Sequence, residues 1–102
     1  MQFQLRMYRV KPGALEQWLE EWREGVLPLR RQHGFSVLGP WVVREESRFV
    51  WIVGHDGDFA AADKAYYDSP ERAALDPPPT RHLDEIATWM MDGVPASPTA
   101  AP

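Results

Sequence analysis

Three side chains of this 102-residue sequence have the chemistry to move a proton or to stabilise the charge left behind: Arg6, Tyr8 and His55. Imidazoles in general titrate near neutral pH, so a histidine such as His55 is a candidate to take a proton from a phenol or an activated carbon. Arg6 and Tyr8 are two residues apart and share one face of a strand. On that face the guanidinium can stabilise an enolate or a carboxylate, and the phenol can donate to an oxyanion. These residues are the candidate catalytic group.

Each of these assignments has a structural alternative. His55 can be a histidine at a strand end that is bonded to the loop from Asp56 to Asp58. Arg6 and Tyr8 can lie in an interface between two copies of the chain, paired with carboxylates across it. The sequence leaves both interpretations open.

Aromatic side chains are the candidates for binding a planar ligand. Those that can form an aromatic box are Trp41, Trp51, Tyr66 and Tyr67. Aromatic residues at these spacings are also typical of a hydrophobic core. His82 is a further binding candidate, although its place beside Arg81 and Asp84 also favours an exposed structural role.

The sequence predicts no metal centre and no cofactor. Its three histidines, His33, His55 and His82, lie 22 and 27 residues apart, without the close spacing of metal ligands. The segment Asp56-Gly57-Asp58 begins like a calcium loop but lacks the later oxygen ligands, so a turn followed by a helix cap explains it. No phosphate-binding or dinucleotide fingerprint occurs. Haem ligation by a histidine remains as an alternative.

Composition excludes several classes of partner. The net charge is −4 with both signs interspersed, which gives no basic stripe for nucleic acid. There is no cysteine, and no apolar run approaches the roughly 20 residues that span a bilayer. The N-terminus enters a strand pattern directly, without the pattern of a signal peptide. We therefore expect a cytoplasmic protein with no nucleic-acid or membrane partner.

Hydrophobic periodicity predicts the order strand, helix, strand, strand, helix, strand. The predicted ranges are strand 2–10, helix 12–33, strands 35–44 and 48–55, helix 59–67, a helical segment opening at Ser69-Pro70, and strand 82–91. Pro40 lacks an N–H for a strand ladder, which places its strand at a sheet edge and fits a split βαβ sheet in strand order 4-1-3-2. Pro28 predicts a kink or a tightened turn near the end of the first helix.

The strand around Trp51 is apolar on both sides. Phe49, Trp51 and Val53 point one way, whereas Val50 and Ile52 point the other. Two short helices can bury only one face of the sheet. A second copy of the chain is the simplest cover for the other face, so we expect a homodimer with facing sheets.

Four segments resemble the NIPSNAP family of the dimeric α+β barrel superfamily. They are Leu5-Arg6-Met7-Tyr8-Arg9-Val10-Lys11-Pro12-Gly13, Leu27-Pro28-Leu29, His33-Gly34 and Leu38-Gly39-Pro40-Trp41. The resemblance implies an α+β, ferredoxin-like protomer, a dimer whose two sheets form a barrel, and a pocket between the helices and the concave sheet. His55 departs from it, because the family usually has an aromatic residue near that position.

The resemblance also sets the expected functions. Relatives on the same barrel include cofactor-independent monooxygenases and cyclases of aromatic polyketides, haem-degrading enzymes and small-molecule decarboxylases. We expect a cofactor-independent enzyme that moves a proton on a hydrophobic, aromatic or polyketide-like substrate, as a cyclase, isomerase or monooxygenase. The alternatives are a noncatalytic ligand-binding or scaffold dimer and a haem-binding protein. The domain is expected to span residues 1–92, followed by a disordered tail, 93–102.

Overall fold

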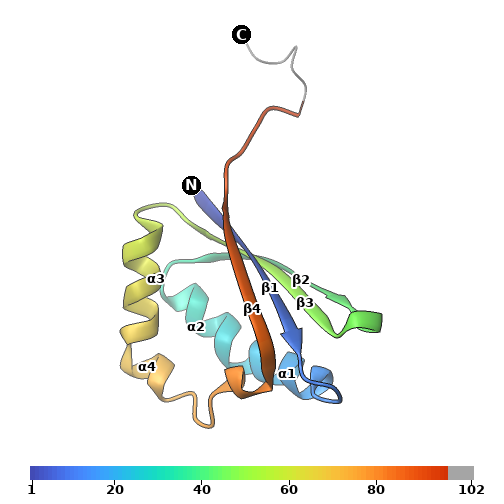
Figure 1. Cartoon of the computed structure of the whole chain (residues 1–102). Helices are drawn as coiled ribbons and strands as arrows, with labels where there is room; N and C mark the ends of the chain where they lie inside the picture. The colour runs from blue at the N-terminus through green and yellow to red at the C-terminus, as the bar shows by residue number, and fades with distance from the viewer. Residues whose placement is uncertain (97–102) are drawn as a thin grey trace.

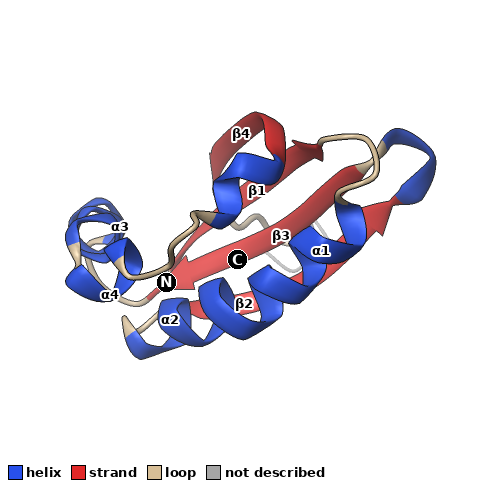
Figure 2. Ribbon diagram, turned by 90° about the horizontal axis from the view of Figure 1, so that it is seen from below, coloured by secondary structure: helices blue, strands red, loops and turns tan. Residues whose placement is uncertain are grey.

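The computed structural model, which describes residues 1–96, is a four-stranded antiparallel sheet with its helices on one face (Figures 1 and 2). The strands are β1 (Gln2–Val10), β2 (Ser36–Val43), β3 (Arg48–His55) and β4 (Leu83–Met91). Their spatial order β2-β3-β1-β4 is the expected order 4-1-3-2 read from the other edge. The α+β, ferredoxin-like fold is therefore confirmed, with β2 at an edge as Pro40 predicts. Within residues 1–96, no helix is long and apolar enough to cross a membrane.

The helices follow the predicted pattern with small differences in length. They are α1 (Leu15–Glu21), the π turn η1 (Trp22–Val26), α2 (Leu27–Gln32), α3 (Phe59–Asp68) and α4 (Pro70–Ala73), with 3₁₀ turns η2 (Arg44–Glu46) and η3 (Pro79–His82). Asp58 caps α3 by accepting from the N–H of Ala61, at 3.1 Å, and Ser69 caps α4 by accepting from the N–H of Arg72, also at 3.1 Å. Both caps were predicted from the sequence.

The turn before Pro28 is widened, whereas the sequence predicted a kink or a tightened turn. The N–H of Leu27 donates to the carbonyl of Trp22, five residues back, which is the pattern of a π turn. Pro28 has no N–H with which to continue the regular four-residue pattern. The widened turn η1 keeps α1 and α2 in one continuous helical stretch along the β2 and β3 half of the sheet (Figure 2).

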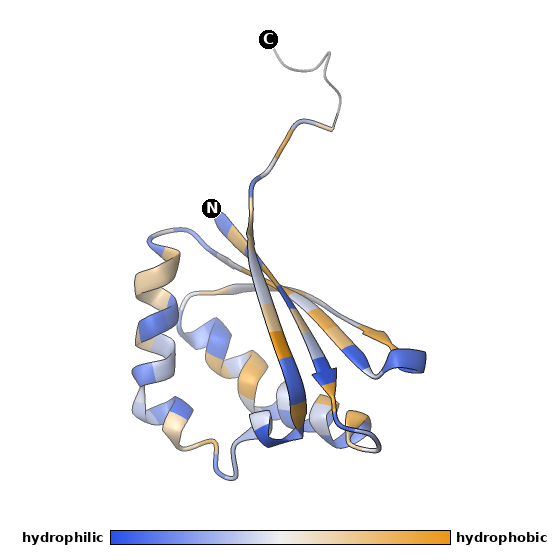
Figure 3. Ribbon diagram, in the orientation of Figure 1, coloured by the Kyte–Doolittle hydropathy of each residue, from blue (hydrophilic) through white to orange (hydrophobic). Residues whose placement is uncertain are grey.

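The core lies between the helices and one face of the sheet. Its aromatic members pack edge to face, for example Trp22 against Phe49 and against Trp51, with ring centroids 5.3 Å apart in both pairs. The opposite face of the sheet carries no helix, and apolar residues lie along its strands (Figure 3). We call this surface the open face, and Leu38, Trp41 and Trp89 are each about half exposed on it.

The chain continues beyond β4 without helix or strand through residue 96. Of the tail expected to be disordered, residues 97–102 lie outside the described residues.

Candidate functional site

Two arginines are buried between the sheet and the helices. Arg6 on β1 is 5% exposed and Arg30 on α2 is 1% exposed. The alternation of β1 places Arg6 on the helix-covered face together with Gln4 and Tyr8. Arg30 follows Val26 by four residues and so falls on the buried side of the helix.

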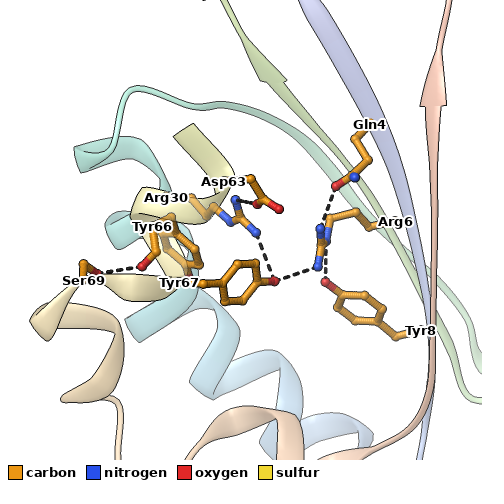
Figure 4. Close-up of polar contacts among 8 residues, drawn as sticks. All are labelled: Gln4, Arg6, Tyr8, Arg30, Asp63, Tyr66, Tyr67 and Ser69. Carbon is orange, nitrogen blue, oxygen red and sulfur yellow. Dashed lines mark hydrogen bonds and ion pairs between the residues drawn. The ribbon is translucent and has the colours of Figure 1, made fainter. Parts of the chain in front are cut away.

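Arg6 is held by uncharged acceptors alone. Its Nε donates to the Tyr8 hydroxyl at 2.7 Å, its Nη1 to Gln4 Oε1 at 2.6 Å and its Nη2 to the Tyr67 hydroxyl at 2.8 Å (Figure 4). Burial opposes its charge, but the interactions with Tyr8 and Tyr67 outweigh that cost and raise the pKa of Arg6 above its usual value. Arg6 therefore keeps a full positive charge at every pH of interest.

Arg30 has one charged partner. Its Nη1 donates to Asp63 Oδ1 at 2.7 Å, and its guanidinium lies 3.9 Å from the ring centroid of Tyr66. Its Nη2 also reaches the Tyr67 hydroxyl, at 3.3 Å (Figure 4). Two buried cations thus share one carboxylate, which leaves the site with an excess of positive charge.

A narrow, partly open cavity of about 30 Å³ lies among these residues, and its lining includes Arg6, Tyr8, Arg30, Trp51, Tyr66 and Tyr67. Small-molecule sites usually measure about 300 Å³ or more. In this conformation the cavity has room for only a small polar group.

The buried phenols of this cavity are neutral at physiological pH. Burial raises the pKa of Tyr8, against a smaller lowering by Arg6, and burial likewise raises the pKa of Tyr66. A protonated phenol beside a guanidinium can donate to an oxygen that gains negative charge during a reaction. The site is therefore suited to stabilising an oxyanion.

The structure brings together five of the candidate residues from the sequence. Arg6, Tyr8, Trp51, Tyr66 and Tyr67 all line the cavity. Arg6 and Tyr8 lie on the helix-covered face of the sheet, not on the open face.

Trp41 does not belong to the aromatic box that the sequence predicted. It pairs with Val50 in the sheet register and is 53% exposed on the open face. A bulge in β2 between Leu38 and Trp41, at Gly39-Pro40, accompanies this placement. The sheet therefore separates Trp41 from the other three aromatic residues.

Two histidine candidates lie outside the lining of the cavity. His55 ends β3, where its Nδ1 accepts from the N–H of Gly57 at 2.9 Å, as in the structural alternative. His82 is 9% exposed and its Nε2 lies 2.9 Å from Glu21 Oε2, so the exposed role expected for it is wrong. Its carboxylate partner lies on α1, far away in the sequence.

Sequence reasoning missed Arg30, Asp63 and Gln4 as members of the site. One signal was present for Arg30, because a charged residue four positions after Val26 falls on the apolar side of its helix. Asp63 pairs with it from α3, 33 residues away. No local pattern marks such a pairing.

Glu21 anchors the connection into β4. Arg81 donates to both of its carboxylate oxygens, at 2.8 and 2.9 Å, and His82 lies against one of them. Hydrogen bonding from Arg81 is the main cause that lowers the pKa of Glu21 below its ordinary value of 4.5. Because the folded-state pKa is lowered, the ionised carboxylate stabilises the fold above pH 4.5, and this contribution is lost as pH falls through the folded-state pKa.

We expect Glu21→Gln to lower the free energy of unfolding by about 1 kcal/mol at pH 7, because the substitution removes an ion pair that is partly exposed. The difference from wild type should shrink below pH 4.5. Urea unfolding at pH 7 and at lower pH measures both. The matched control is Glu20→Gln, an exposed neighbour on α1. A difference between wild type and Glu21→Gln that stays constant with pH contradicts the assignment.

A comparison with models of protein families gives one match to this chain. The family model described as NIPSNAP matches residues 3–97. The chain belongs to the NIPSNAP family. No curated protein matches it. Among the described residues of this NIPSNAP chain, no group of three or more His, Cys, Asp or Glu side chains could hold a metal ion.

Solved structures share the NIPSNAP fold at low sequence identity. An uncharacterized NIPSNAP domain protein from Burkholderia xenovorans is 19% identical, with a TM-score of 0.82 over 96% of this chain and 99% of that one. A NIPSNAP family protein from Agrobacterium tumefaciens is 17% identical, with a TM-score of 0.84 over 95% and 96%. A structure described as an antibiotic biosynthesis monooxygenase is 24% identical, with a TM-score of 0.69 over 93% and 100%. At these identities the likeness shows the fold alone.

Proposed function

We propose that this NIPSNAP protein is a cofactor-independent enzyme that moves a proton on a hydrophobic, aromatic or polyketide-like substrate. The observation that carries the proposal is Arg6, a buried guanidinium with only uncharged acceptors, beside the protonated phenol of Tyr8. A buried charge that makes no direct ion pair is costly to folding, and such arrangements are typical of functional sites. The likeness in fold to an antibiotic biosynthesis monooxygenase supports the same class of function.

The chemistry follows from the donors. A substrate carbonyl oxygen at Tyr8 and Arg6 accepts their hydrogen bonds, which lowers the pKa of the adjacent C–H. Water takes the carbon-bound proton, and the electron pair of the C–H bond moves onto the carbonyl oxygen to give an enolate. That enolate can close a ring, take a proton back at another carbon, or react with dioxygen, so the proposal covers cyclase, isomerase and monooxygenase activity.

Proton transfer can be tested before the natural substrate is known. Anthrone, a tricyclic aromatic ketone with an acidic C–H, is incubated with the protein in D₂O under nitrogen, and hydrogen exchange is followed by NMR. We expect exchange above background, and a loss of about 10²-fold in Tyr8→Phe, which keeps the ring but removes the donor.

His55→Ala is the control for this experiment, because His55 lies outside the cavity lining. It should exchange as fast as wild type. Exchange at the background rate in wild type contradicts the proposed activity on such ketones. An effect of His55→Ala as large as that of Tyr8→Phe would place the proton transfer elsewhere.

We further propose that the protein is a homodimer whose open faces pack together. Support comes from the apolar side chains that remain exposed there, including Leu38, Trp41 and Trp89. The dimer would enclose the two sheets and leave the helices, with the Arg6 site beneath them, on the outside.

The alternative function is a noncatalytic ligand-binding or scaffold dimer. It is favoured by the volume of about 30 Å³, which is far below that of ordinary substrate pockets. Two other hollows are open surface grooves of about 380 and 550 Å³. The first mixes charged residues such as Glu21 and Glu24 with apolar ones such as Leu75, and the second is lined largely by charged residues such as Arg9 and Arg44. The exchange experiment separates this alternative from the enzyme.

A further inference from the structure

Unpaired polar atoms gather around the cavity of about 30 Å³. Within residues 1–96, six side-chain polar atoms are buried without a hydrogen-bond partner, and five of them belong to residues that line this cavity. These are Trp18 Nε1, Arg30 Nε, Trp51 Nε1, Tyr66 OH and Arg72 Nε. Trp51 Nε1 has the Tyr8 hydroxyl nearby, and the N–H acts to lower the pKa of that hydroxyl. Buried polar groups are nearly always paired, so this group of atoms on the residues that line one small cavity indicates a site that a polar group completes.

The chemistry of these atoms points to an acceptor. Four of the five are indole or guanidinium N–H groups, which donate and cannot accept. The charges agree, because Arg6 and Arg30 bring two positive charges and Asp63 supplies one negative charge. A group with acceptor oxygens and a negative charge would pair with the unpaired donors and balance the excess positive charge.

Tyr67 occupies the place where such a group would sit. Nη2 of Arg6 and Nη2 of Arg30 converge on its hydroxyl oxygen, at 2.8 and 3.3 Å (Figure 4). The residue is 44% exposed on α3. The phenol oxygen of a partly exposed side chain thus holds a position between two cations.

We infer that the cavity is a carboxylate site, and that a substrate carboxylate replaces the Tyr67 hydroxyl between Arg6 and Arg30. The inference rests on the proposed function and names its substrate class as a hydrophobic carboxylic acid. The small cavity receives the carboxylate, and the apolar body of the ligand lies at the mouth beside Ile86, which is about half exposed. The Tyr8 hydroxyl then remains available to the reacting oxygen.

The probe for this site is 4-fluorobenzoate, with 4-fluorobenzamide as the neutral match, and binding is measured by ¹⁹F NMR. We expect the benzoate to bind at least tenfold more tightly than the benzamide, because only the benzoate carries the charge. Tyr67→Phe keeps the ring and removes the competing oxygen, so benzoate should bind this variant about tenfold more tightly than wild type.

The matched pair for charge is Arg30→Gln and Arg31→Gln. Arg31 is the exposed neighbour on α2, so its variant should bind benzoate like wild type, whereas Arg30→Gln should lose at least tenfold. Should Arg30→Gln fail to fold, the comparison of Tyr67→Phe with wild type alone tests the inference, since Tyr67 is 44% exposed and Phe keeps its ring.

Three outcomes would overturn the inference: equal binding of benzoate and benzamide, equal binding by the two arginine variants when both fold, or weaker benzoate binding by Tyr67→Phe. The proposed function is tested separately, by the exchange experiment. Exchange on neutral anthrone without benzoate binding would retain the enzyme and remove the carboxylate site. Benzoate binding without exchange would retain the site and favour the noncatalytic alternative.

Discussion

Trp89→Glu is expected to convert a two-chain assembly into a monomer. Trp89 pairs with Leu5 in the sheet register and lies half exposed on the open face, where the proposed dimer interface would bury it. A carboxylate there would be desolvated without a partner, which costs several kcal/mol and exceeds what one side chain contributes to most interfaces. Sedimentation equilibrium of the wild type and the variant at the same concentrations measures the change.

Ile86→Glu is the matched control, because both residues lie on β4. Ile86 is 52% exposed and Trp89 50%, but Ile86 pairs with Tyr8 on the helix-covered face. The control variant should remain a dimer. A wild-type monomer, or equal dissociation of the two variants, contradicts the open-face interface.

Arg6→Met is expected to abolish benzoate binding while the protein keeps or gains stability. Met has similar length without charge, so the substitution removes the desolvation cost of a buried guanidinium that makes no direct ion pair. The side chains of Tyr8, Gln4 and Tyr67 each lose the hydrogen bond that they accept from Arg6, and these losses limit any gain in the free energy of unfolding. Thermal unfolding and ¹⁹F titration on the same samples measure the two effects.

Arg9→Met separates this effect from a general response of β1 to losing an arginine. Arg9 lies on the same strand with its side chain 48% exposed. It should change neither binding nor, by more than about 0.5 kcal/mol, stability. A loss of several kcal/mol in Arg6→Met would show that Arg6 holds the fold together, and would remove the main support for the proposed function.

The fold was accessible from the sequence because its signals are local and agree with one another. The alternation in β3, the Asp58 and Ser69 caps and the edge signal of Pro40 each predict an element or its place, and the structure has all of them. Arg6 and Tyr8 could be grouped for the same reason, since two residues apart on a strand means one face.

The rest of the site depends on how distant segments pack. Asp63 reaches Arg30 across 33 positions, and Tyr67 reaches Arg6 across 61. Trp41 shows the opposite case, since an aromatic residue that suits a ligand box lies beyond the sheet from the cavity, after a bulge in β2. Residue type alone could not distinguish these cases.

The π turn η1 bears on how this site withstands changes in chain length over evolution. Each residue added to or removed from a helix rotates everything that follows by about 100°. The five-residue hydrogen bond from Leu27 to Trp22 amounts to one extra residue placed ahead of α2. Because the wider turn absorbs that residue, Arg30 keeps the direction it would have after a regular helix one residue shorter. A one-codon deletion in Trp22–Val26 would therefore restore a regular helix and leave Arg30 facing Asp63 and Tyr67, so the anion chemistry proposed for this protein withstands a change in chain length that would turn the end of a regular helix.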